Sequence, residues 1–96
     1  MGTAKAAPER REVHFSGRVQ GVGFRYTTRQ IAARFRVCGF VRNLRDGRVE
    51  LVVEGDAGEL DGFLAAVEGE LERHIEHREV SVLPASGEFG GFEVRH

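Results

Sequence analysis

The chain has 96 residues, 41% of them hydrophobic and 30% charged, and a formal net charge of −1. A chain of this length forms one domain around one modest core, and its balanced charge excludes the global basic field of a nucleic-acid-binding protein. It has no apolar run long enough to cross a membrane, and its single cysteine, Cys38, excludes an internal disulfide, so we expect a cytoplasmic protein with neither membrane nor nucleic-acid partners.

The beginning of the chain predicts a tail, a strand and a helix. Residues 1–10 are polar and alanine-rich without periodicity, so we expect a flexible tail before a domain that spans 11–96. Apolar and polar residues then alternate over 11–19, which predicts a half-buried strand. Over 24–35 the apolar residues recur at helical spacing, which predicts a helix.

Two β-rich runs follow, at 37–43 and 49–55. The Asp-Gly pair at 46–47 lies between them, and such a pair between β-rich runs predicts a β-hairpin. Residues of the second run alternate between apolar and charged positions, so we expect one face of this strand to be buried.

The remainder of the chain predicts a second helix and two strands. Asp56 and Glu59 match a variant of the capping box, and the apolar spacing after them predicts a helix over about 57–73. Valines at 80–82, followed by a proline, indicate a fourth strand, and 92–94 a short final one.

The predicted elements follow the order βαββαβ, with a short extra strand at the C-terminus. This order favours an α+β fold, in which an antiparallel sheet carries two helices on one face. The sequence therefore predicts a ferredoxin-like α/β sandwich.

The glycine-rich turn at 17–25 carries the strongest chemical signal. It joins the first strand to the N-terminus of the first helix, where unpaired N–H groups and the helix dipole favour an anion. Gly21 and Gly23 permit positive φ angles, and Arg25 adds a planar fork that can bind two phosphate oxygens. The pattern predicts a phosphate site, although a simple tight turn has the same composition.

Asn43 is the only asparagine, and it ends the second predicted strand. Asparagine at this position either caps the turn that follows or supplies an amide to a site. If the first and third strands are central in the sheet, the end of the first strand and Asn43 meet at one end of it.

Two motifs resemble those of the acylphosphatase family. They read Gly17-x-Val19-Gln20-Gly21-Val22-Gly23-Phe24-Arg25 and Gly39-Phe40-Val41-Arg42-Asn43-Leu44-x-Asp46-Gly47-x-Val49-Glu50, the second followed by Glu54-Gly55. The resemblance covers nearly all of the chain except the tail, and two motifs at the right interval make it specific.

The resemblance implies that a small-molecule acyl phosphate is hydrolysed at its carboxyl–phosphate bond without metal or cofactor. It also implies the roles of the site residues: Arg25 binds the phosphoryl group, and Asn43 positions the attacking water. The implied phosphate cradle is the backbone of Gln20, Gly21, Val22, Gly23 and Phe24.

Two departures from the family pattern are visible. Phe40 stands where many members have tryptophan, and we expect packing to survive this change. Arg36 stands where a glycine often ends the helix, so we expect a strained turn or a displaced helix end.

Alternative functions remain open on the sequence alone. A domain that binds acyl or carbamoyl phosphate without turnover would carry the same motifs, whereas RNA-recognition domains share the strand order but need aromatics that the third strand lacks. His74 and His77 lie three residues apart without a third ligand nearby, so we predict no metal site. We expect a monomer.

Overall fold

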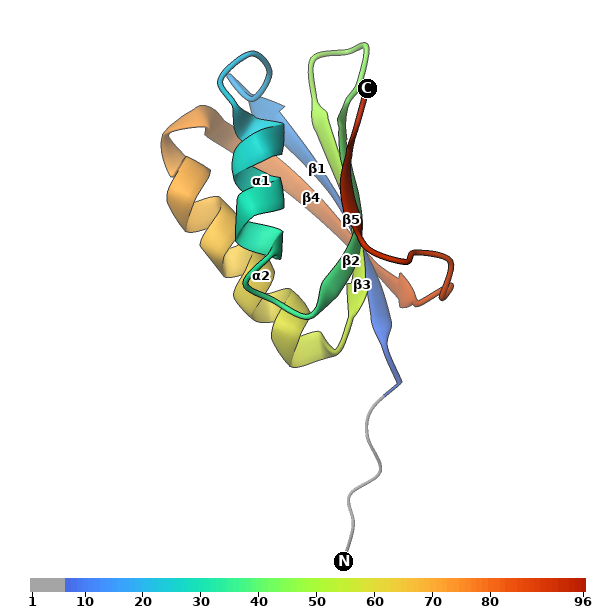
Figure 1. Cartoon of the computed structure of the whole chain (residues 1–96). Helices are drawn as coiled ribbons and strands as arrows, with labels where there is room; N and C mark the ends of the chain where they lie inside the picture. Colours follow the sequence, from blue (N-terminus) through green and yellow to red (C-terminus); the bar gives the residue numbers. More distant parts are fainter. Residues whose placement is uncertain (1–6) are drawn as a thin grey trace, which may run out of the picture.

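Two helices cover one face of a five-stranded sheet, which confirms the predicted α+β sandwich (Figure 1). This architecture comes from a computed structural model that describes residues 7–96. In chain order the elements are β1 (Glu9–Gly17), α1 (Phe24–Ala32), β2 (Val37–Asn43), β3 (Val49–Gly55), α2 (Ala57–Leu71), the short 3-10 helix η1 (Glu72–His74), β4 (Ile75–Pro84) and β5 (Phe92–Arg95).

The strand order is β4-β1-β3-β2-β5, so β1 and β3 are interior strands. The first four strands pair antiparallel as predicted, but β5 pairs parallel with β2, and the sheet is mixed. The parallel direction of β5 follows from the place where β4 ends. The last residue of β4, Pro84, lies in one row across the sheet with Glu9, Gly55 and Val37, the first residue of β2. The chain therefore leaves β4 at the end of the sheet where β2 begins. A strand that starts there beside β2 runs parallel to it.

The core lies between the sheet and the helices, where alternating strand residues meet the apolar stripes of α1 and α2. Its side chains are predominantly apolar, with the buried Thr28 hydroxyl bonded to the Phe24 carbonyl, and burial of the apolar surface is the main stabilising contribution to the fold. Its members from the sheet include Val13, Phe15, Val41, Val49, Leu51 and Val53, and those from the helices include Phe24, Ile31, Leu60, Phe63, Leu64 and Val67.

Helix α1 ends at Ala32, three residues before the predicted end. Arg36 adopts no left-handed conformation, because no non-glycine residue among 7–96 has a positive φ angle. Instead, the Arg36 N–H donates to Glu59 Oε1 at 2.7 Å. The displaced helix end, rather than strain, therefore accommodates the arginine.

The same contact corrects the predicted capping box. Asp56 is the N-cap residue of α2, but its side chain makes no capping hydrogen bond. The carboxylate of Glu59 is already bound to the Arg36 N–H and is used to fix the turn after α1. A long-range contact has replaced the local one that the spacing suggested.

Some element boundaries differ from the sequence prediction. Strand β1 begins at Glu9 rather than at 11, because Glu9 pairs with both neighbouring strands. Of the predicted tail, residues 1–6 lie outside the described residues. Strand β4 begins at Ile75, much earlier than its valines indicated, because it is an edge strand with mostly exposed and polar residues.

Glu54 ties the loop between β4 and β5 to the open face of the sheet. The buried carboxylate accepts hydrogen bonds from the Ser86 N–H at 2.9 Å, the Ser86 hydroxyl at 2.8 Å and the Gly87 N–H at 3.0 Å. Burial alone would raise the pKa of Glu54, but these bonds and the charge of Arg10 outweigh it and lower the pKa. The ionised carboxylate therefore stabilises the fold at neutral pH, and this contribution is lost as the pH falls below the ordinary glutamate range.

Candidate functional site

Three segments that are distant in sequence meet at one end of the sheet: the loop between β1 and α1, the turn between β2 and β3, and the residues after β5 (Figure 1). The strand register explains this meeting. Val49 pairs with Phe15 on one side and with Asn43 on the other, so Asn43 lies level with a residue just before the loop. The predicted convergence of the glycine loop and Asn43 follows from the interior positions of β1 and β3.

The loop presents its backbone because of two glycines. Gly21 and Gly23 both have φ angles of +77°, and Gly23 is the N-cap of α1 in a left-handed conformation. A Cβ at either glycine would meet nothing within 4 Å, so the backbone conformation rather than lack of space requires glycine, and the space beside each is open.

The N-terminus of α1 keeps its donors available. Its first helical hydrogen bond runs from the Thr27 N–H to the Gly23 carbonyl at 3.0 Å, and Gly23 has no side chain to cap the N–H groups before it. The first turn carries no acidic residue. This end of α1 is therefore an electropositive group of main-chain donors.

The side chain of Gln20 connects the loop to the hairpin turn. Its Nε2 donates to the Leu44 carbonyl at 2.7 Å and to the Arg48 carbonyl at 2.9 Å. Because Leu44 directly follows Asn43, this double contact fixes the loop relative to the asparagine. The sequence assigned only the backbone of Gln20 to the site, since no local pattern signals a contact across 24 and 28 positions.

Replacing Gln20 with methionine is expected to loosen the loop. The variant keeps the side-chain length but removes both donors from half-buried carbonyls, which should cost about 1–3 kcal/mol of stability. Urea unfolding measures the loss of stability. The affinity for inorganic phosphate, measured by calorimetry, reports on binding of phosphate to the loop and should weaken. The matched control is Gln30→Met on the exposed face of α1. Unchanged phosphate affinity in Gln20→Met would show that the two Gln20 contacts do not shape the site.

Arg25 projects from the first turn of α1 toward the end of β5. Its Nη1 donates to the Arg95 carbonyl at 2.9 Å and lies 3.2 Å from His96 Nδ1. A guanidinium has five N–H donors, so most of the fork remains able to bind a ligand while one nitrogen is anchored. The sequence did not single out Arg95 and His96, because their role is to hold Arg25 across 70 positions.

Asn43 offers an acceptor. Its side chain is half-buried, and its Oδ1 accepts no hydrogen bond from any residue among 7–96. Paired strand residues point to the same face, so Asn43 shares the face of Val49, which is buried beneath the helices. A buried acceptor without a protein partner is costly unless a ligand or water supplies the donor.

A charged row on the opposite face braces the strand that carries Asn43. Glu50 accepts from Arg42 Nε at 2.7 Å and lies 2.9 Å from His14 Nε2. Burial opposes ionisation of Glu50, but the hydrogen bonds from His14 and Arg42 outweigh it and lower the pKa. His14, Glu50 and Arg42 form one row across β1, β3 and β2. This row is adjacent to the row that contains Phe15, Val49 and Asn43.

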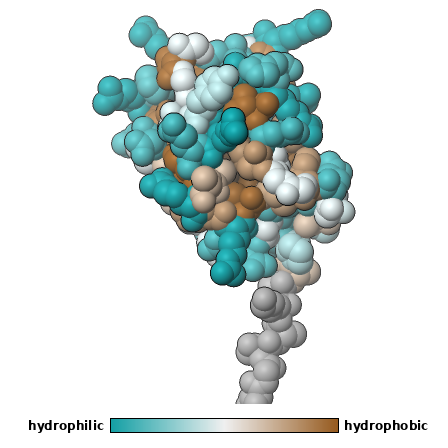
Figure 2. Space-filling view, viewed as in Figure 1, coloured by the Kyte–Doolittle hydropathy of each residue, from teal (hydrophilic) through white to brown (hydrophobic). Residues whose placement is uncertain are grey.

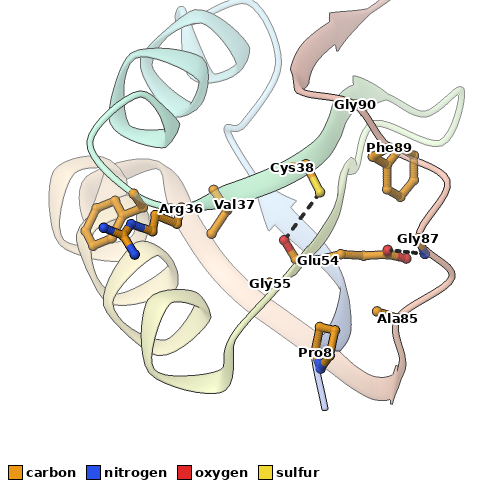
Figure 3. A pocket seen from close by; sticks show the side chains of 11 residues that line it. Pro8, Arg36, Val37, Cys38, Glu54, Gly55, Ala85, Gly87, Phe89 and Gly90 are labelled. Atoms are coloured by element: carbon orange, nitrogen blue, oxygen red, sulfur yellow. Dashed lines mark hydrogen bonds between the residues drawn. The ribbon is translucent and has the colours of Figure 1, made fainter. Parts of the chain in front are cut away.

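A cavity outside this site lies at the other end of the sheet (Figure 3). It measures about 420 Å³, and Cys38, Glu54 and Phe89 line it. Its carboxylate is already bound to the loop, and burial raises the pKa of the Cys38 thiol, which makes the thiol a poor nucleophile. No cluster of three or more potential metal ligands occurs within 7–96.

Comparison with known proteins gives consistent matches. The acylphosphatase family model matches residues 11–94. A protein of Rubrobacter xylanophilus named acylphosphatase is 52% identical over 88 residues, covering 91% of this chain and 80% of that protein. One of Salinibacter ruber with the same name is 43% identical, covering 98% and 96%. The solved acylphosphatase of Bacillus subtilis superposes with a TM-score of 0.81 at 29% identity, covering 92% and 99%.

Proposed function

The chain belongs to the acylphosphatase family and hydrolyses acyl phosphates, and from this premise we propose that the loop, Arg25 and Asn43 carry out the reaction. The observation that supports this assignment most directly is their meeting at the N-terminus of α1. The substrate is a small molecule that carries a carboxyl–phosphate anhydride.

In the proposed complex, the main-chain N–H groups from Gln20 to Phe24 surround the phosphoryl oxygens. The positive end of α1 and the Arg25 fork add charge where the transition state spreads it over the equatorial oxygens. Because these donors are held in place before the substrate arrives, little reorganisation is needed during the reaction.

The leaving group needs no acid. The P–O bond to the acyl group breaks, and the carboxylate departs with the electron pair. Its conjugate acid has a pKa of about 4, so it leaves without being protonated. The water oxygen forms the new P–O bond while Asn43 Oδ1 accepts a hydrogen bond from one of its O–H groups, which stays intact and directs the water's lone pair at phosphorus. A phosphoryl oxygen of the substrate takes the other proton, which yields a carboxylate and inorganic phosphate.

The proposal extends to the setting of the enzyme. We infer a monomer that acts in the cytoplasm without a nucleic-acid partner. The near-zero net charge supports the absence of a nucleic-acid partner, and the single half-buried cysteine supports the cytoplasmic setting. Within residues 7–96, no helix has the length and apolarity to span a membrane.

The test is a hydrolysis assay with benzoyl phosphate in the presence of a chelator. Turnover should persist without added metal, and inorganic phosphate should inhibit competitively because product and substrate share the loop. Binding of the acyl phosphate without release of phosphate would instead favour a non-catalytic domain for acyl or carbamoyl phosphate.

A further inference from the structure

Large hydrophobic side chains are exposed at only two places among residues 7–96. Five such side chains are exposed in that range. Three of them, Val80, Val82 and Leu83, lie on the edge strand β4, where exposure follows from the edge position. The other two are Val22 and Tyr26, with 40% and 55% of their surface exposed. Figure 2 shows a largely hydrophilic surface with small separate hydrophobic patches, one of them at the end of the molecule where the loop before α1 lies.

These two residues flank the phosphate-binding elements. Val22 stands between the two left-handed glycines, and Tyr26 directly follows Arg25. Phe24 and Thr28 are buried on the side of α1 that faces the core. Tyr26 lies two positions from each of them, about 200° around the helix. Its ring therefore points away from the sheet. Packing within the fold does not account for either side chain.

The direction of the reaction supplies a reason for them. In phosphoryl transfer the attacking and leaving oxygens lie roughly in line through phosphorus. Asn43 belongs to the sheet layer, so a water that it directs approaches from the sheet side. The leaving acyl group then extends away from the sheet, toward the outer surface that carries Val22 and Tyr26.

We propose that Val22 and Tyr26 form the contact surface for the acyl group and make the enzyme select acyl phosphates with an apolar, preferably aromatic, acyl part. This inference rests on the proposed roles of Arg25 and Asn43. The ring of Tyr26 offers a face for offset stacking with an aromatic acyl group. The first turn of α1 carries no carboxylate that would repel the departing anion.

The test compares kcat/KM for benzoyl phosphate and acetyl phosphate, which share the phosphoryl group and differ in the acyl part. The wild-type chain should prefer benzoyl phosphate. Tyr26→Gln should lower the benzoyl-to-acetyl ratio about 5–10-fold, through KM for benzoyl phosphate, because contact with a bound group affects ground state and transition state alike. Acetyl phosphate hydrolysis should remain within about 2-fold of wild type.

Two further variants define the result. Tyr26→Phe keeps the ring and should keep the ratio, whereas Val82→Gln removes an exposed apolar side chain on β4 and should leave both substrates unaffected. An unchanged ratio in Tyr26→Gln, whether activity persists or falls equally for both substrates, overturns the inference and leaves the proposed function intact. Failure of the wild-type chain to hydrolyse either substrate overturns both.

Discussion

Replacing Arg25 with glutamine is expected to lower kcat/KM for benzoyl phosphate by about 10³-fold. The structure anchors this guanidinium at the N-terminus of α1 through its bond to the Arg95 carbonyl. Glutamine keeps a polar side chain, two bonds shorter, but provides neither the charge nor the two-pronged geometry. Steady-state kinetics measures the loss, which should fall on both kcat and KM because the phosphoryl group is charged before and during the reaction.

Two companion variants separate charge, geometry and folding. Arg25→Lys retains a point charge without the fork and should fall between wild type and glutamine. Arg29→Gln makes the same change one turn later on the exposed side of α1 and should leave kcat/KM unchanged. Circular dichroism should show cooperative unfolding in all three. Retention of more than a tenth of the activity in Arg25→Gln would contradict the assignment.

Replacing Asn43 with alanine is expected to lower kcat by about 10²–10³-fold with little change in KM. The amide is expected to act on the water and not on the substrate, so phosphate affinity should survive. Stability should be kept, since the variant removes a buried oxygen that has no partner within the described residues. Kinetics together with phosphate inhibition tests both halves of the expectation.

The aspartate and glutamine variants test the role of the amide. Asn43→Asp preserves shape but places a negative charge near a phosphate dianion, so it should lose activity and raise KM as well. Asn43→Gln keeps the amide but moves it by one carbon, and should recover only part of kcat. A folded Asn43→Ala protein with full turnover would exclude Asn43 from the mechanism.

The sequence was sufficient for the parts of the fold that repeat a local pattern. Strands β2 and β3 begin and end where their residues predicted, because alternation and an Asp-Gly turn are strong local signals. The assignment of Arg25 and Asn43 to one site came from the family resemblance, and strand order supported it only on the condition that the first and third strands are central. The geometric reason for it is the strand order, which places Val49 between the strands of Phe15 and Asn43.

What escaped prediction depends on contacts between distant residues. The Gln20 side chain donates to the hairpin turn, and the Glu59 carboxylate accepts from the Arg36 N–H instead of capping its own helix. The Arg95 carbonyl accepts from Arg25. None of these has a periodic signature in the sequence. Edge strand β4 was underestimated for a related reason, since a strand exposed along most of its length carries little hydrophobic alternation.

The anchoring of Arg25 by Arg95 and His96 has a practical consequence for protein production. Any residues joined after His96 would emerge beside the guanidinium to which we assign phosphoryl binding. A polyhistidine purification tag at that position would bring imidazoles and a new main chain into the mouth of the site. Recombinant protein for kinetics should therefore carry its tag at the other terminus, or have it cleaved before assay.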